Sequence, residues 1–579
     1  MTAALAAVAL AFGALAGLGL PAFYEAFLYL VFSWIALATS WSLLSGYAGY
    51  FSFGHGAFFG AGMYTTATLT TVAGVPFFAT LPVAGVVAAL LAGGIGAVVF
   101  RVRRLRGELF GLLTLAIGFV LATIVLNTRI DGGPGVYLSG VPLPRLVFSP
   151  TGTLYLVALA LAVGTVGLAR AITRSRFGMG LAAIHDDEDV AEVEGVPTFR
   201  YKLLAFVLSA GIAGMVGGVH AMYVSYITVG ETFSITVPLY VVLMSVLGGA
   251  RHWLGPAVGA TIIASSLYAF TGGSQAILGR ALVALALVLV ILLLPEGVVP
   301  AVLRRVRRPT AADAPAEVAP RVLASPAAAD LPVDAAGAGA LECRDVWKAF
   351  GGIQALRGVS LDVAPGEIVG LVGPNGSGKT TLINVISGHY AADRGRITLG
   401  RAELTGHPAH AIAGLGISRT YQIPRPFAHL SVLENVTAAA MFGGARHGAR
   451  EARGAARDWL AFTGLARRAG ALPDALNLHE RKFLELARAL AAEPRVILLD
   501  EVLSGLNPTE IGSALGLVRA IRARGVSVVF VDHLMRAVLE LVDRVVVLNQ
   551  GEVIAVGRPR DALADPRVVE VYLGKSHAA

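Results

Sequence analysis

The stretch GPNGSGKTT, residues 373–381, follows the apolar run IVGLV at residues 368–372 and decides the fold around it. A strand, a glycine-rich turn and a Lys-Thr pair that opens a helix form a pattern in which backbone N–H groups surround a polyphosphate. We expect Lys379 to reach the outer phosphates and the Thr380 hydroxyl to reach Mg²⁺, while the helix N-terminus faces the anion. The predicted nucleotide-binding residues are Gly373, Pro374, Asn375, Gly376, Ser377, Gly378, Lys379, Thr380 and Thr381.

A second signal lies downstream, where the apolar run at residues 496–499 ends in Asp500 and Glu501. In proteins with a phosphate loop, a carboxylate at the end of a buried strand holds the metal, and a neighbouring carboxylate can polarise the attacking water. We therefore expect Asp500 to bind Mg²⁺ through water and Glu501 to act as the general base. An acidic pair that merely ends a strand is the structural alternative.

The residues before the phosphate loop have the composition of a membrane protein. The whole chain is 55% hydrophobic and only 15% charged, and its mean hydropathy is +0.70. Apolar stretches long enough to cross a hydrocarbon layer predict about eight to ten spans. The first lacks a basic start and a clear cleavage site, so we interpret it as a membrane helix. The stretches lie near residues 2–20, 24–45, 56–72, 78–100, 108–127, 152–172, 203–224, 235–250, 254–271 and 277–295.

Basic residues predict the orientation of these spans. Arginines and lysines cluster at residues 101–106, 170–202 and 304–308, which indicates three cytoplasmic loops. Residues 128–150, rich in Gly and Pro, then lie outside. Because these clusters adjoin apolar spans, the net charge of +8 indicates membrane anchoring, and we expect no nucleic-acid binding. The single cysteine, Cys343, excludes an intramolecular disulfide and is expected on a half-buried strand.

The composition divides the chain into three parts: a transmembrane domain at residues 1–303, a flexible Ala/Pro-rich linker at 304–340 and a domain with the phosphate loop at 341–579. The linker is too poor in large apolar residues to pack. After it, short strand-like runs at 368–372, 496–499, 526–531 and 544–548 alternate with helical patterns such as 482–492, which is typical of an α/β fold with a parallel sheet. The predicted fold is a polytopic α-helical membrane domain followed by an α/β P-loop NTPase domain.

From Leu341 to about Lys575 the chain resembles the ATPase subunits of ABC transporters, which implies that residues 341–579 form an ATP-binding domain of ABC type. The resemblance implies ATP and Mg²⁺ as cofactors, and catalytic roles for Lys379, Glu501 and His533. It also implies that Phe350, in AFGG at 349–352, stacks on adenine. Gln422, in YQIP at 421–424, corresponds to the glutamine that senses Mg²⁺ and the lytic water, and His533 corresponds to the histidine that contacts the γ-phosphate.

The chain departs from this family at the signature sequence. The usual L-S-G-G-Q is replaced by LNLHE at residues 476–480, which lacks both glycines and hinders backbone approach to a phosphate. Asn477 and Glu480 fit a capping box at a helix start, which is the structural alternative. A second departure is SGLN at 504–507, where an aspartate usually ends the loop. We hypothesise that the composite site completed by this signature works less well than the other.

The membrane half resembles permeases of branched-chain amino acid uptake systems over roughly residues 24–300, most clearly at residues 43–60 and 247–259. Residues 176–197 resemble the coupling loop of importers, with RFG at 176–178, the acidic stretch 186–194 and GVP at 195–197. Such a cytoplasmic helix would dock near Gln422, although a solvated acidic helix is the alternative. His55 is expected to pack among glycines and to bond a neighbouring carbonyl, and we do not assign it as a site.

Together these patterns predict a fused permease and ATPase subunit that imports branched-chain amino acids or related small polar or amphiphilic solutes across the cytoplasmic (inner) membrane. The expected partners are a second permease, a second ATPase, an extracytoplasmic substrate-binding protein and membrane lipid. An exporter half is an alternative that long cytoplasmic helix extensions and six spans would mark, and neither is evident in the sequence. An ATP-regulated channel or a non-hydrolysing regulatory subunit is a further alternative, opposed by intact Lys379, Asp500, Glu501 and His533.

Overall fold

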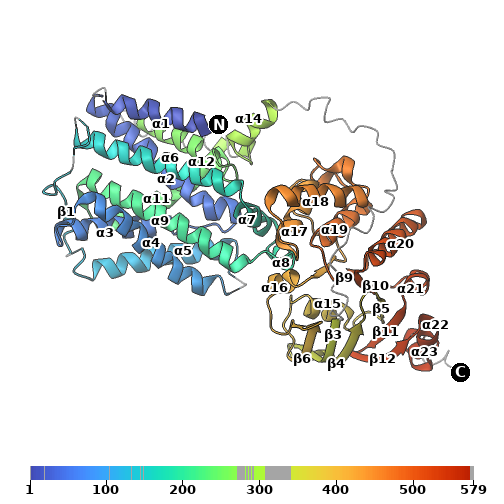
Figure 1. Ribbon diagram of the computed structural model, residues 1–579. Helices are drawn as coiled ribbons and strands as arrows, with labels where there is room; N and C mark the ends of the chain where they lie inside the picture. Colours follow the sequence, from blue (N-terminus) through green and yellow to red (C-terminus); the bar gives the residue numbers. More distant parts are fainter. Residues whose placement is uncertain are drawn as a thin grey trace. The chain divides into compact units, whose positions relative to one another are not determined.

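The chain forms two compact units in a computed structural model. One unit comprises Met1–His185 and Phe199–Ala311, and the other comprises Asp186–Thr198 and Ala312–Ala579 (Figure 1). The acidic segment 186–198 therefore groups with the second half of the chain although it lies in the first half of the sequence. The structure describes residues 2–17, 20–102, 105–131, 133–143, 145–147, 149–269, 281, 285, 288–289, 292–306 and 341–573. The predicted linker lies almost entirely outside these residues.

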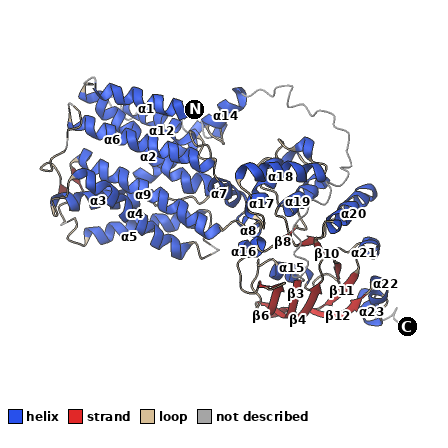
Figure 2. Cartoon of the chain, in the orientation of Figure 1, coloured by secondary structure: helices blue, strands red, loops and turns tan. Residues whose placement is uncertain are grey.

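The first unit is built of helices, with one short antiparallel pair of strands, β1 (Val136–Tyr137) and β2 (Tyr226–Ile227). Figure 2 shows the long helices of this unit lying roughly alongside one another. The helices with residues in this unit are α1 (Thr2–Gly17), α2 (Ala22–Ala48), α3 (His55–Thr71), α4 (Phe77–Val99), α5 (Glu108–Leu126), α6 (Pro150–Thr173), α7 (Arg176–Asp186), α9 (Thr198–Val224), α10 (Val229–Thr232), α11 (Thr236–Gly248), α12 (Gly255–Ala269) and α14 (Val298–Val306).

Among the described residues, six helical stretches are long and apolar enough to cross a membrane: α2, α4, α5, α6, α9 and the stretch Val229–Gly248. Each predicted span up to residues 254–271 contains a described helix. Helix α3 has 17 residues, and α1 and α12 are described only as far as Gly17 and Ala269. The last predicted span, 277–295, lies largely outside the described residues. The described chain thus supports a multi-pass membrane domain with fewer full-length spans than the eight to ten that we expected.

Glycines allow the helices of the first unit to approach closely. A Cβ placed on Gly62 of α3 would collide with the carbonyl of Gly214 in α9, and one on Gly217 would collide with the carbonyl of Phe59. Small residues at such crossings give membrane helices their van der Waals contact. In its most apolar window α2 is 72% buried, whereas α5 is only 17% buried. Helix α2 is therefore central in the unit, and α5 turns most of its surface outward.

The second unit contains two sheets (Figure 2). The larger has the order β12-β11-β5-β10-β9-β8, parallel except for the edge strand β12, and the smaller is antiparallel with the order β4-β3-β6-β7. The strands are β3 (Leu341–Phe350), β4 (Ile353–Val363), β5 (Ile368–Val372), β6 (Arg394–Leu399), β7 (Ala402–Glu403), β8 (Ile417–Arg419), β9 (Val496–Asp500), β10 (Ser527–Val531), β11 (Arg544–Asn549) and β12 (Glu552–Gly557). The four predicted strand runs coincide with β5, β9, β10 and β11.

Helices pack around these sheets. The predicted helix at 482–492 overlaps α19 (Leu478–Ala491) and ends one residue beyond it. Cys343 lies on β3 as expected, but it is fully buried in the hydrophobic core, not half-buried. The other helices are α8 (Glu188–Val193), α15 (Lys379–Ile386), α16 (Ala409–Gly414), α17 (Val432–Phe442), α18 (Ala449–Phe462), α20 (Pro508–Ala523), α21 (Met535–Leu541), α22 (Pro559–Leu563) and α23 (Pro566–Leu573).

Candidate active site

The glycine-rich loop connects the wholly buried strand β5 to helix α15. Its backbone turns through positive φ at Gly373 (151°), Gly376 (80°) and Gly378 (107°), a region that side chains with a Cβ rarely enter. At Gly378 a Cβ would lie 2.7 Å from the carbonyl oxygen of Ala355. Asn375, Gly376 and Thr380 remain exposed, so the loop presents its rim to solvent. These glycines therefore shape a backbone cradle that is open to a ligand.

Two polar side chains in the loop are suited to an anion. The Lys379 ammonium donates to the carbonyls of Gly373 (2.8 Å) and Pro374 (2.9 Å), and its burial lowers its pKa while the charges of Glu501 and Asp500 act in the opposite direction. The buried Ser377 Oγ has no hydrogen-bond partner among the described residues. An orphaned hydroxyl, a cation and a cradle that a Cβ would fill fit a polyphosphate group.

The carboxylates lie at the end of β9, which runs between β8 and β10. Asp500 is 2% exposed, and its burial raises its pKa to about 6, although the charge of Arg419 acts to lower it. The Asp500 backbone N–H donates to Thr420 Oγ1 at 3.2 Å. Glu501 follows with φ of 48°, unusual for a residue with a Cβ, and its N–H donates to the Val531 carbonyl at 2.8 Å. Two strands thus fix the backbone of the acidic pair.

The structure brings three of the predicted catalytic and sensing residues together. Gln422 Nε2 donates to Glu501 Oε2 at 2.7 Å, and His533 Nδ1 lies 4.0 Å from the same oxygen. Gln422 follows β8, Glu501 follows β9 and His533 follows β10, which are neighbours in the sheet. Phe350 lies apart, at the end of β3 in the smaller sheet, where it is 41% exposed and contacts Tyr390 edge-on.

Both departures from the family pattern form helix caps. At the start of α19, the Asn477 side chain accepts from the Glu480 N–H (2.8 Å) and the Glu480 carboxylate accepts from the Asn477 N–H (3.0 Å). Glu480 also pairs with Arg468 at 2.8 Å. Asn507 forms the same kind of box with Glu510 at the start of α20. The capping interpretation of the sequence is therefore confirmed, and Glu480 is committed to contacts within its own chain.

The acidic segment 186–198 packs against the loop that follows Gln422. Asp187 caps α8 by accepting from the N–H groups of residues 189 and 190, and it also pairs with Arg425 at 2.6 Å. The Asp186 carboxylate accepts from the His429 N–H at 2.8 Å and contacts its ring nitrogen at 2.7 Å. The solvated-helix alternative is thus wrong, because this segment is held by specific charge pairs.

A buried charge cluster adds to the contact between the acidic segment and the rest of the second unit. Arg488 of α19 is 0% exposed and lies between Glu194 (3.1 Å) and Glu485 (2.9 Å), and its guanidinium covers the ring of Phe427 at 4.5 Å. Burial raises the pKa of Glu194, and the Arg488 charge acts in the opposite direction. Glu485 also accepts from the Arg425 N–H at 2.9 Å. Sequence analysis missed these residues, since no local motif pairs Glu194 with an arginine so distant in the chain.

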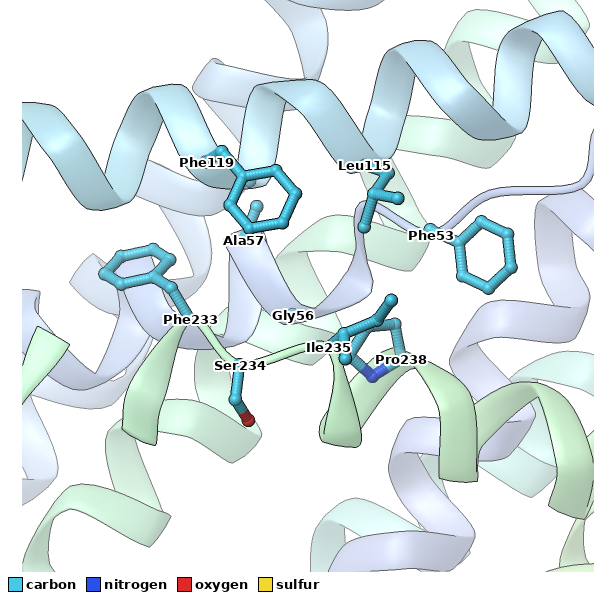
Figure 3. A pocket seen from close by; sticks show the side chains of 10 residues that line it. Phe53, Gly56, Ala57, Leu115, Phe119, Phe233, Ser234, Ile235 and Pro238 are labelled. Carbon is cyan, nitrogen blue, oxygen red and sulfur yellow. The ribbon is translucent and has the colours of Figure 1, made fainter. Parts of the chain in front are cut away.

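The membrane unit contains an apolar pocket that sequence analysis did not predict. Leu115 and Phe119 of α5 face Phe233, Ile235 and Pro238 across it (Figure 3). Phe119 is 60% exposed and Ile235 is 50% exposed, so the pocket lies at the surface of this unit. Its lining comes from α3, α5, the segment between α10 and α11, and the start of α11.

Known protein families match both the membrane half and the nucleotide-binding half of the chain. Residues 23–294 match the permease component of branched-chain amino acid transport systems, residues 356–504 match the ABC transporter family, and residues 552–578 match the branched-chain amino acid ATP-binding cassette transporter family. A probable branched-chain amino acid transport ATP-binding protein LivG of Archaeoglobus fulgidus is 36% identical over 248 residues, which is 40% of this chain and 95% of that protein.

A second relative is the high-affinity branched-chain amino acid transport ATP-binding protein BraF of Pseudomonas aeruginosa. It is 34% identical over 250 residues, 41% of this chain and 98% of that protein. Among solved structures, a nucleotide-free ATP-binding cassette from an ABC transporter aligns with TM-score 0.38 and 30% identity, covering 41% of this chain and 100% of that one.

The fold and the site define a membrane permease joined to a P-loop ATPase in one polypeptide. This chain belongs to the branched-chain amino acid family of ABC transporters. It is a multi-pass membrane protein with a nucleotide-binding, ATP-hydrolysing domain in the cytoplasm, and this membership implies partner permease and ATPase subunits.

Proposed function

We propose that this chain couples ATP hydrolysis to the import of branched-chain amino acids, or of related small polar or amphiphilic solutes, across the cytoplasmic membrane. One observation carries the proposal: the loop that begins at Gln422 joins the candidate catalytic carboxylate, Glu501, to the acidic segment 186–198. A second permease, a second ATPase and an extracytoplasmic substrate-binding protein complete the transporter.

In this proposal the loop at 373–381 binds the phosphates, Lys379 contacts the outer ones, and Phe350 stacks on adenine. Thr380, Gln422 and Asp500 would hold Mg²⁺, which would neutralise charge on the phosphates. Glu501 accepts the proton of the attacking water, with Gln422 orienting its carboxylate and His533 donating to the γ-phosphate. The 2.7 Å contact between Gln422 and Glu501 supports this arrangement.

Coupling follows from the short chain between Gln422 and His429. A shift of Gln422 that accompanies ATP binding moves Arg425 and His429, which hold Asp187 and Asp186. In the chain, the acidic segment directly follows α7 and leads into the membrane helix α9. ATP binds one conformation of the site more tightly than another. Its binding therefore shifts the permease between states that open to opposite sides of the membrane.

Substrate selection is assigned mainly to the binding protein. The decisive experiment reconstitutes the complex, isolated through a tag on this chain, in vesicles with its binding protein. We expect the leucine-loaded binding protein to stimulate ATP hydrolysis and leucine uptake together. Hydrolysis that ignores the binding protein would support an exporter, and the absence of turnover would support a regulatory subunit.

The altered signature at residues 476–480 favours a difference in hydrolysis rate between the two ATP sites. Because Asn477 and Glu480 satisfy each other in a cap, their groups are less available to the nucleotide on the partner ATPase. We propose that the composite site completed by residues 476–480 hydrolyses ATP more slowly than the other. Nucleotide trapping is measured after neutralising Glu501 or, separately, the corresponding glutamate of the partner. Unequal losses are expected, and equal losses would rule out the asymmetry.

A further inference from the structure

A buried lysine on α19 holds the loop that carries the candidate general base. Lys482 is 6% exposed, and its ammonium donates to the carbonyls of Glu501 (3.0 Å), Val502 (3.1 Å) and Ser504 (2.5 Å). These contacts use all three N–H donors of a lysine side chain. The contact is therefore with the backbone of the loop and with none of the groups assigned to the nucleotide.

The loop has a conformation that requires such support. Glu501 has φ of 48°, and residues with a Cβ occupy this region at an energetic cost. The Glu501 N–H is bonded to the Val531 carbonyl and the Leu503 N–H to the Asp532 carboxylate at 3.2 Å. These bonds fix the N–H side of the turn. Among the described side chains, Lys482 alone donates to the three carbonyls, and the Glu501 carbonyl also accepts from the Ser504 N–H at 3.3 Å.

The Lys482 side chain is largely shielded from solvent. Burial lowers its pKa, while the charges of Asp532 and Glu501 act in the opposite direction. Hydrogen bonds from a charged donor are roughly twice as strong as neutral ones. Removal of the ammonium would leave three carbonyls without this donor, one of them on the buried Val502.

We propose that Lys482 is a positioning residue for ATP hydrolysis: it fixes the backbone of residues 501–504 so that the Glu501 carboxylate stays within reach of Gln422 and the attacking water. Lys482 itself does not contact the substrate in this role. The inference rests on the proposed function of Glu501 as the general base.

The first test compares ATP binding with ATP hydrolysis in the complex isolated through a tag on the full chain. We expect Lys482→Met to lower kcat by about tenfold or more and to change the Kd for ATP by less than about twofold, because the lost contacts orient a catalytic group and leave the phosphate loop intact. Arg519→Met is the matched control, since it removes one positive charge from a half-exposed pair with Glu540. Unchanged kcat in Lys482→Met would overturn the proposal.

A second variant keeps the test decisive if Lys482→Met fails to fold. Lys482→Arg keeps the charge, but its planar fork cannot reproduce a tripod of donors to three carbonyls. We expect a smaller loss of kcat in the same direction with wild-type ATP binding and thermal unfolding. Wild-type kcat in this variant would also count against the proposal.

A double-mutant cycle separates positioning from a general structural effect. In the Glu501→Gln background, Lys482→Met should lower the residual rate by less than about twofold, because there is no base left to position. A full additional loss would show that Lys482 acts elsewhere. Wild-type hydrolysis in Glu501→Gln alone would instead overturn the general-base assignment, and the positioning role with it.

Discussion

At the scale of single residues, Glu501 has a strained backbone conformation, while its side chain is held by a hydrogen bond. Its φ of 48° is tolerated because its N–H bonds Val531, its carbonyl accepts from Lys482 and its carboxylate accepts from Gln422. Non-glycine residues in this region are strained by about 1–3 kcal/mol and occur most often where function requires them. The strained backbone thus identifies Glu501 as a candidate functional residue, in agreement with the sequence.

Replacement of Glu501 by Gln preserves the size of the side chain and removes the proton acceptor. We expect ATP binding within about twofold of wild type and hydrolysis lowered by about 100-fold or more, in the range of general-base catalysis. Equilibrium nucleotide binding and phosphate release measure the two effects. Glu540→Gln, in a half-exposed pair with Arg519, serves as the control. Retention of more than half of the hydrolysis would contradict the assignment.

The phosphate loop makes a separate prediction at Gly378. Its φ of 107° and the nearby Ala355 carbonyl leave no room for a Cβ, so Gly378→Ala should weaken ATP binding by about tenfold or more, equivalent to about 1.4 kcal/mol. Gly512→Ala is the control, because this glycine lies in α20 with nothing near its Cβ position. That control should stabilise the fold by up to about 1 kcal/mol. Equal nucleotide affinity in both variants would contradict the predicted cradle.

At the scale of elements, α19 connects three parts of the second unit. Lys482, Glu485 and Arg488 follow one another at three-residue intervals, which places them on neighbouring parts of one helix face. They contact the loop 501–504, the loop after Gln422 and the acidic segment, respectively. A rigid helix with these three attachments can transmit a displacement of the nucleotide site to residues 186–198.

The buried pair of Arg488 and Glu194 gives a test of coupling. Breaking a buried ion pair costs about 3–5 kcal/mol, but in Glu194→Gln the Arg488 guanidinium keeps Glu485 as a partner. We expect hydrolysis to continue while the number of solutes moved per ATP falls severalfold. Parallel assays of uptake and phosphate release measure this ratio. Glu342→Gln, in an exposed pair, is the control. An unchanged ratio in Glu194→Gln would argue against coupling through this contact.

The sequence predicted those features whose signals are local. The phosphate loop, the pair Asp500 and Glu501, and the strands β5, β9, β10 and β11 each depend on consecutive residues. The bond between Gln422 and Glu501 joins residues 79 positions apart, and its geometry depends on the neighbouring positions of β8 and β9. The contacts of Lys482 and Arg488 were missed for the same reason, since a charged residue on a helical pattern gives no sign of burial.

Membrane spans show a different limit of sequence prediction. Hydropathy located the apolar stretches, but it does not measure helix length, so α3 counted as a span although it has only 17 residues. The glycine crossings between α3 and α9 were not predictable either, because a membrane helix contains many glycines and only some meet a neighbour. The positions of membrane segments are thus easier to predict than their packing.

At the scale of the whole molecule, one chain supplies a permease half and an ATPase half, and the central claim is that ATP turnover in the second unit drives solute movement through the first. Uptake of labelled leucine into vesicles that contain the assembled complex, its binding protein and internal ATP tests this most directly. We predict that Lys379→Ala abolishes uptake while the complex still assembles and binds the loaded binding protein. Uptake at the wild-type rate in Lys379→Ala would contradict the account.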